Sequence, residues 1–158
     1  MPFALVSPAF HDRSPLPAKF TCDGADVSPP LGVLDPPPKA LSLALICDDP
    51  DAPGGTFVHW VLYNLPPDTR SIPEGVPAFE ILADLGRARQ GKSDFGRVGY
   101  GGPCPPPGAP HHYQFKLYAL DVLLPLKGGP SKADVERAMD GHMLATSRLV
   151  GVYERGQR

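Results

Sequence analysis

The stretch LSLALIC at positions 41–47 and the stretch FVHWVLYNL at positions 57–65 decide the fold class of this chain. Neither stretch alternates cleanly between apolar and polar residues, so a strand built from either would be buried on both faces. Both runs are also short, with a length that is typical of strands and below that of most helices. The sequence therefore predicts two central β-strands here.

The flanking sequence predicts more strands and one helix. Residues 111–120 alternate between apolar and polar side chains, which is typical of a strand with one buried and one wet face. Residues 131–140 have a helical pattern, with Ser131 as N-cap, Asp134 at the third helical position and Gly141 as the stop. Further strands are expected at residues 3–7, 18–22 and 146–153. With about six to eight strands and a single late helix, the expected fold is mainly β, a β-sandwich.

Length and composition favour a single domain covering residues 1–158. Hydrophobic residues make up 42% of the chain, which is enough for a buried core and too much for a disordered one. The 22 prolines and 17 glycines separate the apolar runs instead of replacing them. This distribution indicates many turns and long ordered loops, as in β architectures.

The charge pattern excludes several classes of partner. The formal net charge is −2, from 15 basic and 17 acidic residues, and no basic stripe is visible. Nucleic acid and an anionic membrane surface are therefore not expected as partners. No apolar run approaches the length of about 20 residues that crosses a bilayer, and the first ten residues do not resemble a signal peptide. We expect a cytoplasmic protein without a transmembrane segment.

Three cysteines, Cys22, Cys47 and Cys104, are spaced widely along the chain. Their odd number and the absence of a CxxC motif argue against a disulfide framework and against a structural zinc site. Together with the expected reducing compartment, this predicts three free thiols. No metal and no cofactor are expected.

Three polar clusters interrupt the apolar pattern and are candidates for chemistry. The first is the run Asp48-Asp49-Pro50-Asp51, whose carboxylates repel one another, so at least one needs a partner. The second is His59, inside a buried strand. The third is the loop at 99–110, GYGGPCPPPGAP, whose glycine N–H groups could form an anion-binding nest. The alternatives are an ordinary turn, a core histidine bonded to a carbonyl, and a rigid surface loop.

Strand alternation separates the two adjacent histidines at positions 111 and 112. His111 and Tyr113 share a face with the apolar residues of their strand, whereas His112 shares the other face with Gln114 and Lys116. His111 is therefore the site candidate, and His112 is expected to face water. If the strand ends meet at one edge of the sandwich, then Asp49, His59, His111 and Tyr113 converge.

Several motifs in this order resemble the phosphatidylethanolamine-binding protein family, in its bacterial and archaeal Raf kinase inhibitor-like branch. They are Asp-Pro-Asp-Ala-Pro at 49–53, His-Trp at 59–60, Gly-Pro-Cys-Pro-Pro at 102–106 and His-His-Tyr-Gln-Phe at 111–115. The resemblance extends nearly end to end, including 20–31 and 149–153. One departure is His112, where the family commonly has arginine.

The resemblance implies a two-sheet antiparallel fold with a shallow pocket for phosphate-like or phospholipid headgroup anions, and often a homodimer. The pocket roles of the family map onto Asp49, Ala52, Pro53, Phe57, His59, Gly101, Pro103, His111 and Tyr113. In such a pocket Asp49 is expected either to hold an imidazole in its charged form or to accept a proton or ammonium group of the ligand. Anion affinity is then predicted to rise as the pH falls toward about 6.

The expected function is binding and regulation without turnover, so the chain is not expected to be an enzyme. One alternative is a Cys-His hydrolase that uses Cys104, His111 and Asp49 as nucleophile, base and orienting group. Another is inhibition of a partner kinase or serine protease through exposed loops such as residues 66–96.

Overall fold

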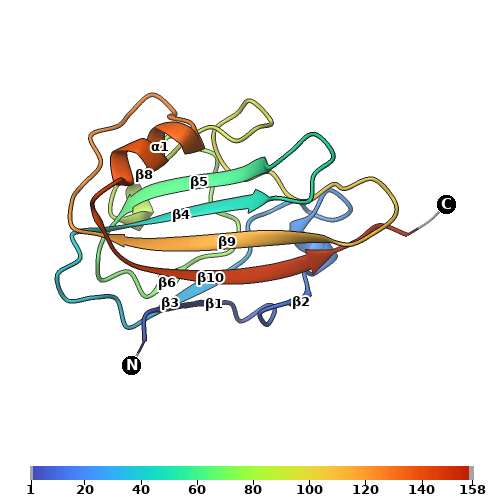
Figure 1. The fold of residues 1–158 in the computed structure, drawn as a ribbon, viewed down its shortest axis with the longest axis horizontal. Coiled ribbons are helices and arrows are strands. Elements are labelled where there is room, and N and C mark those ends of the chain that lie inside the picture. The colour runs from blue at the N-terminus through green and yellow to red at the C-terminus, as the bar shows by residue number, and fades with distance from the viewer. Residues whose placement is uncertain (1, 157–158) are drawn as a thin grey trace.

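A computed structural model describes residues 2–156 of the chain (Figure 1). The described residues form ten β-strands, one α-helix and two short 3₁₀ helices. In chain order these are β1 (Ala4–Val6), β2 (Ser14–Pro15), η1 (Ala18–Phe20), β3 (Leu31–Leu34), β4 (Ser42–Asp49), β5 (Phe57–Leu65), β6 (Ser71–Ile72), β7 (Ile81–Leu82), η2 (Ala83–Leu85), β8 (Ala88–Gln90), β9 (His111–Leu120), α1 (Lys132–Met139) and β10 (Met143–Tyr153).

The strands form two sheets. The large sheet has seven strands in the order β2-β10-β9-β4-β5-β8-β7, and the small sheet has the order β1-β3-β6. Neighbouring strands are antiparallel except β2 and β10, which pair in parallel. The mainly β, two-sheet architecture expected from the sequence is confirmed, and β4, β5 and β9 lie at the centre of the large sheet, as their burial requires.

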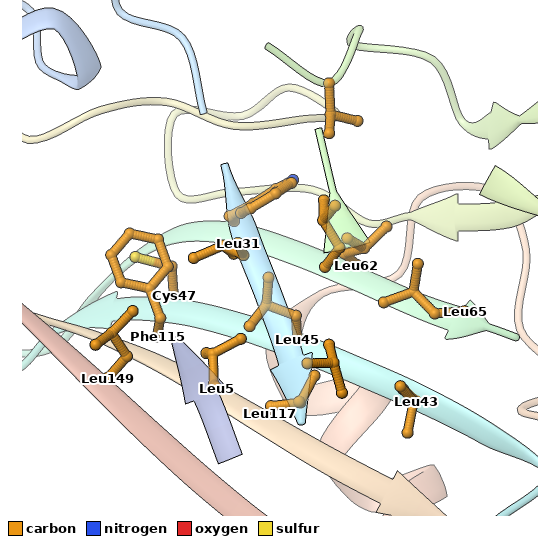
Figure 2. Packing of buried hydrophobic residues seen from close by; sticks show 14 of the residues in the cluster. Leu5, Leu31, Leu43, Leu45, Cys47, Leu62, Leu65, Phe115, Leu117 and Leu149 are labelled. Atoms are coloured by element: carbon orange, nitrogen blue, oxygen red, sulfur yellow. The ribbon is translucent and has the colours of Figure 1, made fainter. Parts of the chain in front are cut away.

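Both faces of the large sheet are covered at β4 and β5, which explains the continuous apolar runs of these two strands. All eight residues of β4 are buried. On one face, side chains of the small sheet such as Leu5 and Leu31 pack against Leu45, Phe115 and other residues of the long strands (Figure 2). On the opposite face, Val135 and Met139 of α1 pack in a second cluster with residues of β4 and β5. A strand between two apolar layers has no wet face, so its sequence shows no polar alternation.

The helix begins as its sequence predicts. The Ser131 hydroxyl accepts a hydrogen bond from the Asp134 N–H, and the Asp134 carboxylate accepts one from the Ser131 N–H. These two bonds satisfy N–H groups that lack partners within the helix. The cap fixes where α1 starts and so positions its buried stripe over the sheet.

One predicted strand is wrong, and one loop contains more structure than expected. Residues 18–22 contain the 3₁₀ helix η1, closed by the Phe20 N–H to Pro17 carbonyl bond, instead of a strand. A single buried side chain, Phe20, anchors this turn, so the apolar content did not reflect strand alternation. Residues 66–96 contain the short strands β6, β7 and β8. Strands of two or three residues are too short to show a period.

The prediction of three free thiols is also wrong. Cys22 and Cys104 form a disulfide across a sequence separation of 82 residues, with their Cα atoms 5.4 Å apart. Among the described residues, Cys47 alone is a free cysteine, and it is buried in the core. Sequence spacing cannot reveal such a pair, because the fold brings together two loops that are distant in the chain.

Candidate functional site

A cavity of about 220 Å³ lies at the end of the large sheet toward which β4 points in Figure 1. Antiparallel pairing places the end of β4 beside the starts of β5 and β9, with Asp49 opposite Phe57 and Asp48 opposite Gln114. Two loops complete the walls. The residues that line the cavity are Asp49, Ala52, Pro53, Phe57, His59, Phe95, Cys104, Pro105, Pro106, His111 and Tyr113.

Asp49 and His111 form a buried pair at the base of this cavity. Their side chains approach to 2.7 Å between Asp49 Oδ2 and His111 Nδ1, and the residues are 3% and 8% exposed. Because a carboxylate only accepts, Nδ1 of His111 donates this bond, which leaves Nε2 as its second polar atom. The other carboxylate oxygen of Asp49 accepts from the Asp51 N–H at 2.8 Å. Both oxygens of Asp49 are therefore engaged within the protein.

His59 is oriented by the backbone of the glycine-rich loop. Its Nδ1 lies 2.6 Å from the carbonyl oxygen of Gly101, and the Gly101 N–H donates to the His59 carbonyl. Since a carbonyl only accepts, Nδ1 carries the hydrogen. Burial lowers the pKa of His59, and this effect is opposed in part by the Gly101 carbonyl and by the charge of Asp49. A neutral His59 offers Nε2 as a hydrogen-bond acceptor.

Tyr113 lies between the two imidazoles. Its ring is T-shaped to His59 at 5.3 Å between centroids and stacks on His111 at 6.2 Å. Burial, followed by the charge of Asp49, raises the pKa of the Tyr113 phenol well above its ordinary value. The phenol therefore keeps its proton and can donate a hydrogen bond to a ligand.

Phe57, a predicted site residue, and Phe95, which the sequence did not predict, form an aromatic wall of the cavity. Phe95 packs against Phe57 at 4.9 Å and against His59 at 5.5 Å between ring centroids. Gly101 makes this packing possible, because a Cβ atom there would lie 2.3 Å from the Phe95 ring. Phe95 is in a loop without periodicity, so no sequence signal pointed to it.

The glycine–proline loop contributes differently from the expectation. Cys104, Pro105 and Pro106 line the cavity, whereas Gly101 and Pro103 act through their backbone and are not among the lining residues. The lining residues that were not predicted, Cys104, Pro105 and Pro106, directly follow Pro103 in the Gly-Pro-Cys-Pro-Pro motif at 102–106. The N–H groups of Gly101 and Gly102 donate to the His59 carbonyl and to the Asp26 carboxylate, so they are not available as an anion-binding nest.

Each of the three carboxylates at the end of β4 and in the turn after it has a basic partner. Asp48 points to the opposite face from Asp49, where Lys116 and Lys132 lie 3.1 and 2.8 Å from its Oδ2 atom. Asp51 accepts from both the backbone and the ring of His112, and the ring bond is the main cause of its lowered pKa. His112 is exposed, as predicted, and its Nδ1 atom lies 2.8 Å from Asp51 Oδ2 on the outer surface.

The disulfide removes the nucleophile of the hydrolase alternative. Cys104 is bonded to Cys22 and presents no thiol to His111. Within residues 2–156, no group of three or more His, Cys, Asp or Glu residues is arranged to hold a metal ion. In the same part of the chain, no helix is long and apolar enough to span a membrane.

Fold and site together define a class of protein: a β-sandwich with a small pocket at the end of its main sheet, lined by aromatic rings, two imidazoles and a compensated carboxylate. The family model for phosphatidylethanolamine-binding proteins matches residues 6–154. The chain belongs to the phosphatidylethanolamine-binding protein family.

Relatives and solved structures agree with this assignment. A UPF0098 protein of Methanothermobacter thermautotrophicus is 51% identical over 152 residues, which cover 96% of this chain and 99% of that protein. A crystal structure of a phosphatidylethanolamine-binding protein homolog from Chlamydia trachomatis superimposes with a TM-score of 0.87 at 42% identity, covering 97% of each chain. The structure of YbcL of E. coli, described as a member of the mammalian family, gives a TM-score of 0.89 at 33% identity, covering 97% of this chain and 98% of that one.

The lowered pKa of His59 predicts a pH-dependent stability. The unfolded chain protonates His59 near the reference pKa of about 6.5, whereas the folded chain does so only at lower pH, so unfolding becomes easier as the pH falls below about 6.5. Between pH 7.5 and 5.5 this group is expected to lower the free energy of unfolding by at most about 1.4 kcal/mol. Urea unfolding of the wild type and of His59→Gln at both pH values measures it.

The variant His59→Gln is expected to lose less stability on acidification than the wild type does. His142→Gln, at an exposed histidine, is the matched control and is expected to behave as the wild type. An equal loss in the wild type and in His59→Gln would contradict the assignment of a neutral, buried His59.

Proposed function

We propose that this protein binds small phosphate-like anions or phospholipid headgroups in the cavity beside Asp49 and His111, and that it acts as a binding and regulatory protein without turnover. The observation that carries the proposal is that both carboxylate oxygens of Asp49 already accept hydrogen bonds, one from the His111 ring and one from the Asp51 backbone N–H. A carboxylate with its own partners does not require a cation from the ligand. When the His111 ring carries both protons, its second nitrogen and the Tyr113 hydroxyl serve as donors to an anion.

The dimensions of the cavity support a small ligand. A volume of about 220 Å³ exceeds the share of a single water molecule, about 30 Å³, and falls below the 300–1,000 Å³ typical of sites for drug-sized molecules. The aromatic rings of Phe57 and Phe95 provide an apolar wall for the carbon atoms of a headgroup. The phosphatidylethanolamine-binding name of the family is consistent with a ligand of this kind.

The absence of turnover is part of the proposal. The lining residues include no serine, threonine or lysine, and the lining cysteine is held in a disulfide. A Ser, Thr or Cys nucleophile, which an imidazole base commonly activates, is not present in free form among the lining residues. The polar groups of the cavity are therefore suited to holding a ligand.

Titration calorimetry with inorganic phosphate at pH 7.5 and pH 6.0 tests the proposal. An ordinary imidazole, with a reference pKa of about 6.5, gains its positive charge over this interval, so affinity is expected to rise about fivefold at the lower pH. His111 lines the cavity and contacts Asp49, so the variant His111→Gln tests whether its ring contributes to this rise. Sulfate is the control ligand, since it keeps its charge across this range.

Both anions are expected to show the increase, and the variant His111→Gln is expected to lose it. No detectable binding of either anion at either pH would remove the proposed function. Binding that is independent of pH would remove the role of the imidazole charge and leave the site itself in place.

Three finer parts of the proposal concern the surroundings of the protein. We propose that it modulates a kinase or a serine protease, that it forms a homodimer and that it works in the cytoplasm. The surface of residues 66–96 offers an apolar depression of about 240 Å³, beside which Phe79 is 65% exposed. Recovery of one enzyme in a stoichiometric ratio by the wild type, but not by Phe79→Asp, tests the first part. Light scattering on the purified protein tests the homodimer.

A further inference from the structure

The disulfide lies at the mouth of the cavity rather than in the core. Cys22 and Cys104 are both exposed, and Cys104 is one of the residues that line the cavity. Exposed disulfides exchange with external thiols more readily than buried ones do. The one covalent cross-link among the described residues is therefore accessible to reduction and is also part of the candidate binding site.

Hydrogen bonds hold the first half of the cavity loop but not the part beside Cys104. Up to Pro103 the loop is bound to the segment around η1: the Cys22 N–H donates to the Pro103 carbonyl at 3.0 Å, and the Gly102 N–H donates to Asp26 at 2.8 Å. Its next backbone hydrogen bond in the described chain is a long one, from Gly108 to Arg155 at 3.4 Å.

Between these points the wall depends on the disulfide. Pro105 and Pro106 have no N–H groups, so they can donate no hydrogen bonds of their own. Among the described residues, the cross-link between Cys22 and Cys104 is the one covalent bond that ties this wall to a distant part of the chain.

The position of Arg155 indicates which of the two sulfur atoms an external thiol attacks. Its Nη1 atom lies 3.9 Å from the sulfur of Cys104, and its Nη2 atom donates to Asp23 at 2.9 Å, which fixes the guanidinium in this place. A nearby guanidinium stabilises a thiolate, so Cys104 is the better leaving group of the two. An external thiol is then expected to attack the sulfur of Cys22.

We propose that the Cys22–Cys104 disulfide is a thiol-exchange site that sets the anion affinity of the adjacent cavity. The thiolate of a dithiol attacks Cys22, the sulfur–sulfur bond breaks, and its electron pair leaves on Cys104. The second thiol of the reagent then displaces Cys22, so the protein ends with two thiols and the dithiol is oxidised to a disulfide. The effect on affinity rests on the proposed function.

Opening the bond weakens anion binding for two reasons. The wall at 104–106 loses its covalent constraint, so a ligand must order it on binding, and that ordering costs free energy. Where the reduced Cys104 loses its proton, its thiolate also places a negative charge on the lining of a cavity that accepts anions. The oxidised protein is the binding form, and the reduced protein is the weak form.

Phosphate titration of the oxidised protein and of protein reduced with excess dithiothreitol tests the proposal. A thiol count under native conditions is expected to rise from zero to two, because Cys47 is buried. Phosphate affinity is expected to fall about five- to tenfold in the reduced protein. In the double variant Cys22→Ser/Cys104→Ser, affinity is expected to lie below that of the oxidised wild type and to be unaffected by dithiothreitol.

A second measurement does not depend on the ligand. Hydrogen exchange at the amides of Cys104, Gly108 and Ala109, the residues of 104–109 that are not proline, is expected to accelerate on reduction, while exchange in β4 stays unchanged and shows that the fold persists. The variant Arg155→Gln is expected to slow the reduction several-fold, whereas Arg137→Gln, at an exposed arginine of α1, is not.

Failure of this proposal can be distinguished from failure of the proposed function. If the oxidised protein does not bind phosphate, the proposed function falls, and faster exchange at 104–109 on reduction would still support the redox control of the wall. Equal phosphate affinity in proteins with zero and with two thiols would overturn the proposal. A disulfide that resists dithiothreitol in the folded protein would overturn it as well.

Discussion

Replacing His111 with alanine is expected to weaken phosphate binding by at least about tenfold and to lower the free energy of unfolding by about 3 kcal/mol. The affinity is expected to fall because the ring is one of the polar groups proposed to bind the anion. The stability falls because the Asp49 carboxylate, 3% exposed, loses the imidazole that lies 2.7 Å from its Oδ2 atom. Calorimetric titration with phosphate and urea unfolding measure the two effects.

The neighbouring residue supplies a matched control. His112 pairs with Asp51 through a bond of similar length, 2.8 Å, but both side chains are more than 40% exposed. An exposed pair contributes at most about 1 kcal/mol, so His112→Ala is expected to change stability little and phosphate affinity less than twofold. Equal losses of affinity at the two positions would show that the cavity beside Asp49 is not the anion site.

Replacing Trp60 with alanine is expected to lower the free energy of unfolding by about 3–5 kcal/mol. Trp60 is fully buried in β5, and its ring is T-shaped to Tyr100 at 5.5 Å between centroids. Its indole N–H donates to Gln90 Oε1 at 2.7 Å, so truncation also leaves a buried acceptor without its donor. A domain with a total stability of about 5–15 kcal/mol loses much of it through this one change. Thermal and urea unfolding measure the loss.

Phe79→Ala is the control for a large aromatic residue outside the core. Phe79 is 65% exposed, so its removal is expected to alter the free energy of unfolding by no more than about 0.5 kcal/mol. Similar losses in Trp60→Ala and Phe79→Ala would mean that Trp60 does not form part of the core between the two sheets.

The sequence predicted the central strands better than the peripheral ones, for a physical reason. The strands at 57–65 and 111–120 have the predicted bounds, because long strands with buried faces impose a pattern on many consecutive residues. The segment at 18–22 contains one buried apolar residue, Phe20, and was wrongly predicted as a strand. Short edge strands such as β6 and β7 carry too few residues to show any period.

The candidate site was predictable where it depends on strand alternation. Alternation alone separated His111 from His112, and the structure places the first in the cavity and the second in water. The contributions of the loops to the site could not be predicted in this way. Phe95 reaches the cavity because Gly101 leaves room for its ring, and the glycine N–H groups are consumed by internal hydrogen bonds. Neither relation is encoded in local spacing.

By itself, the sequence determined the class of fold, the central strands, the capped helix and the inward direction of His111, because each follows from the periodicity or the capping chemistry of adjacent residues. Tertiary structure alone decided that Cys22 reaches Cys104, that Asp49 pairs with His111 while Asp48 turns to two lysines, and that Phe95 closes the cavity. These contacts join segments far apart in the chain, and their partners are chosen by how the two sheets and their loops pack.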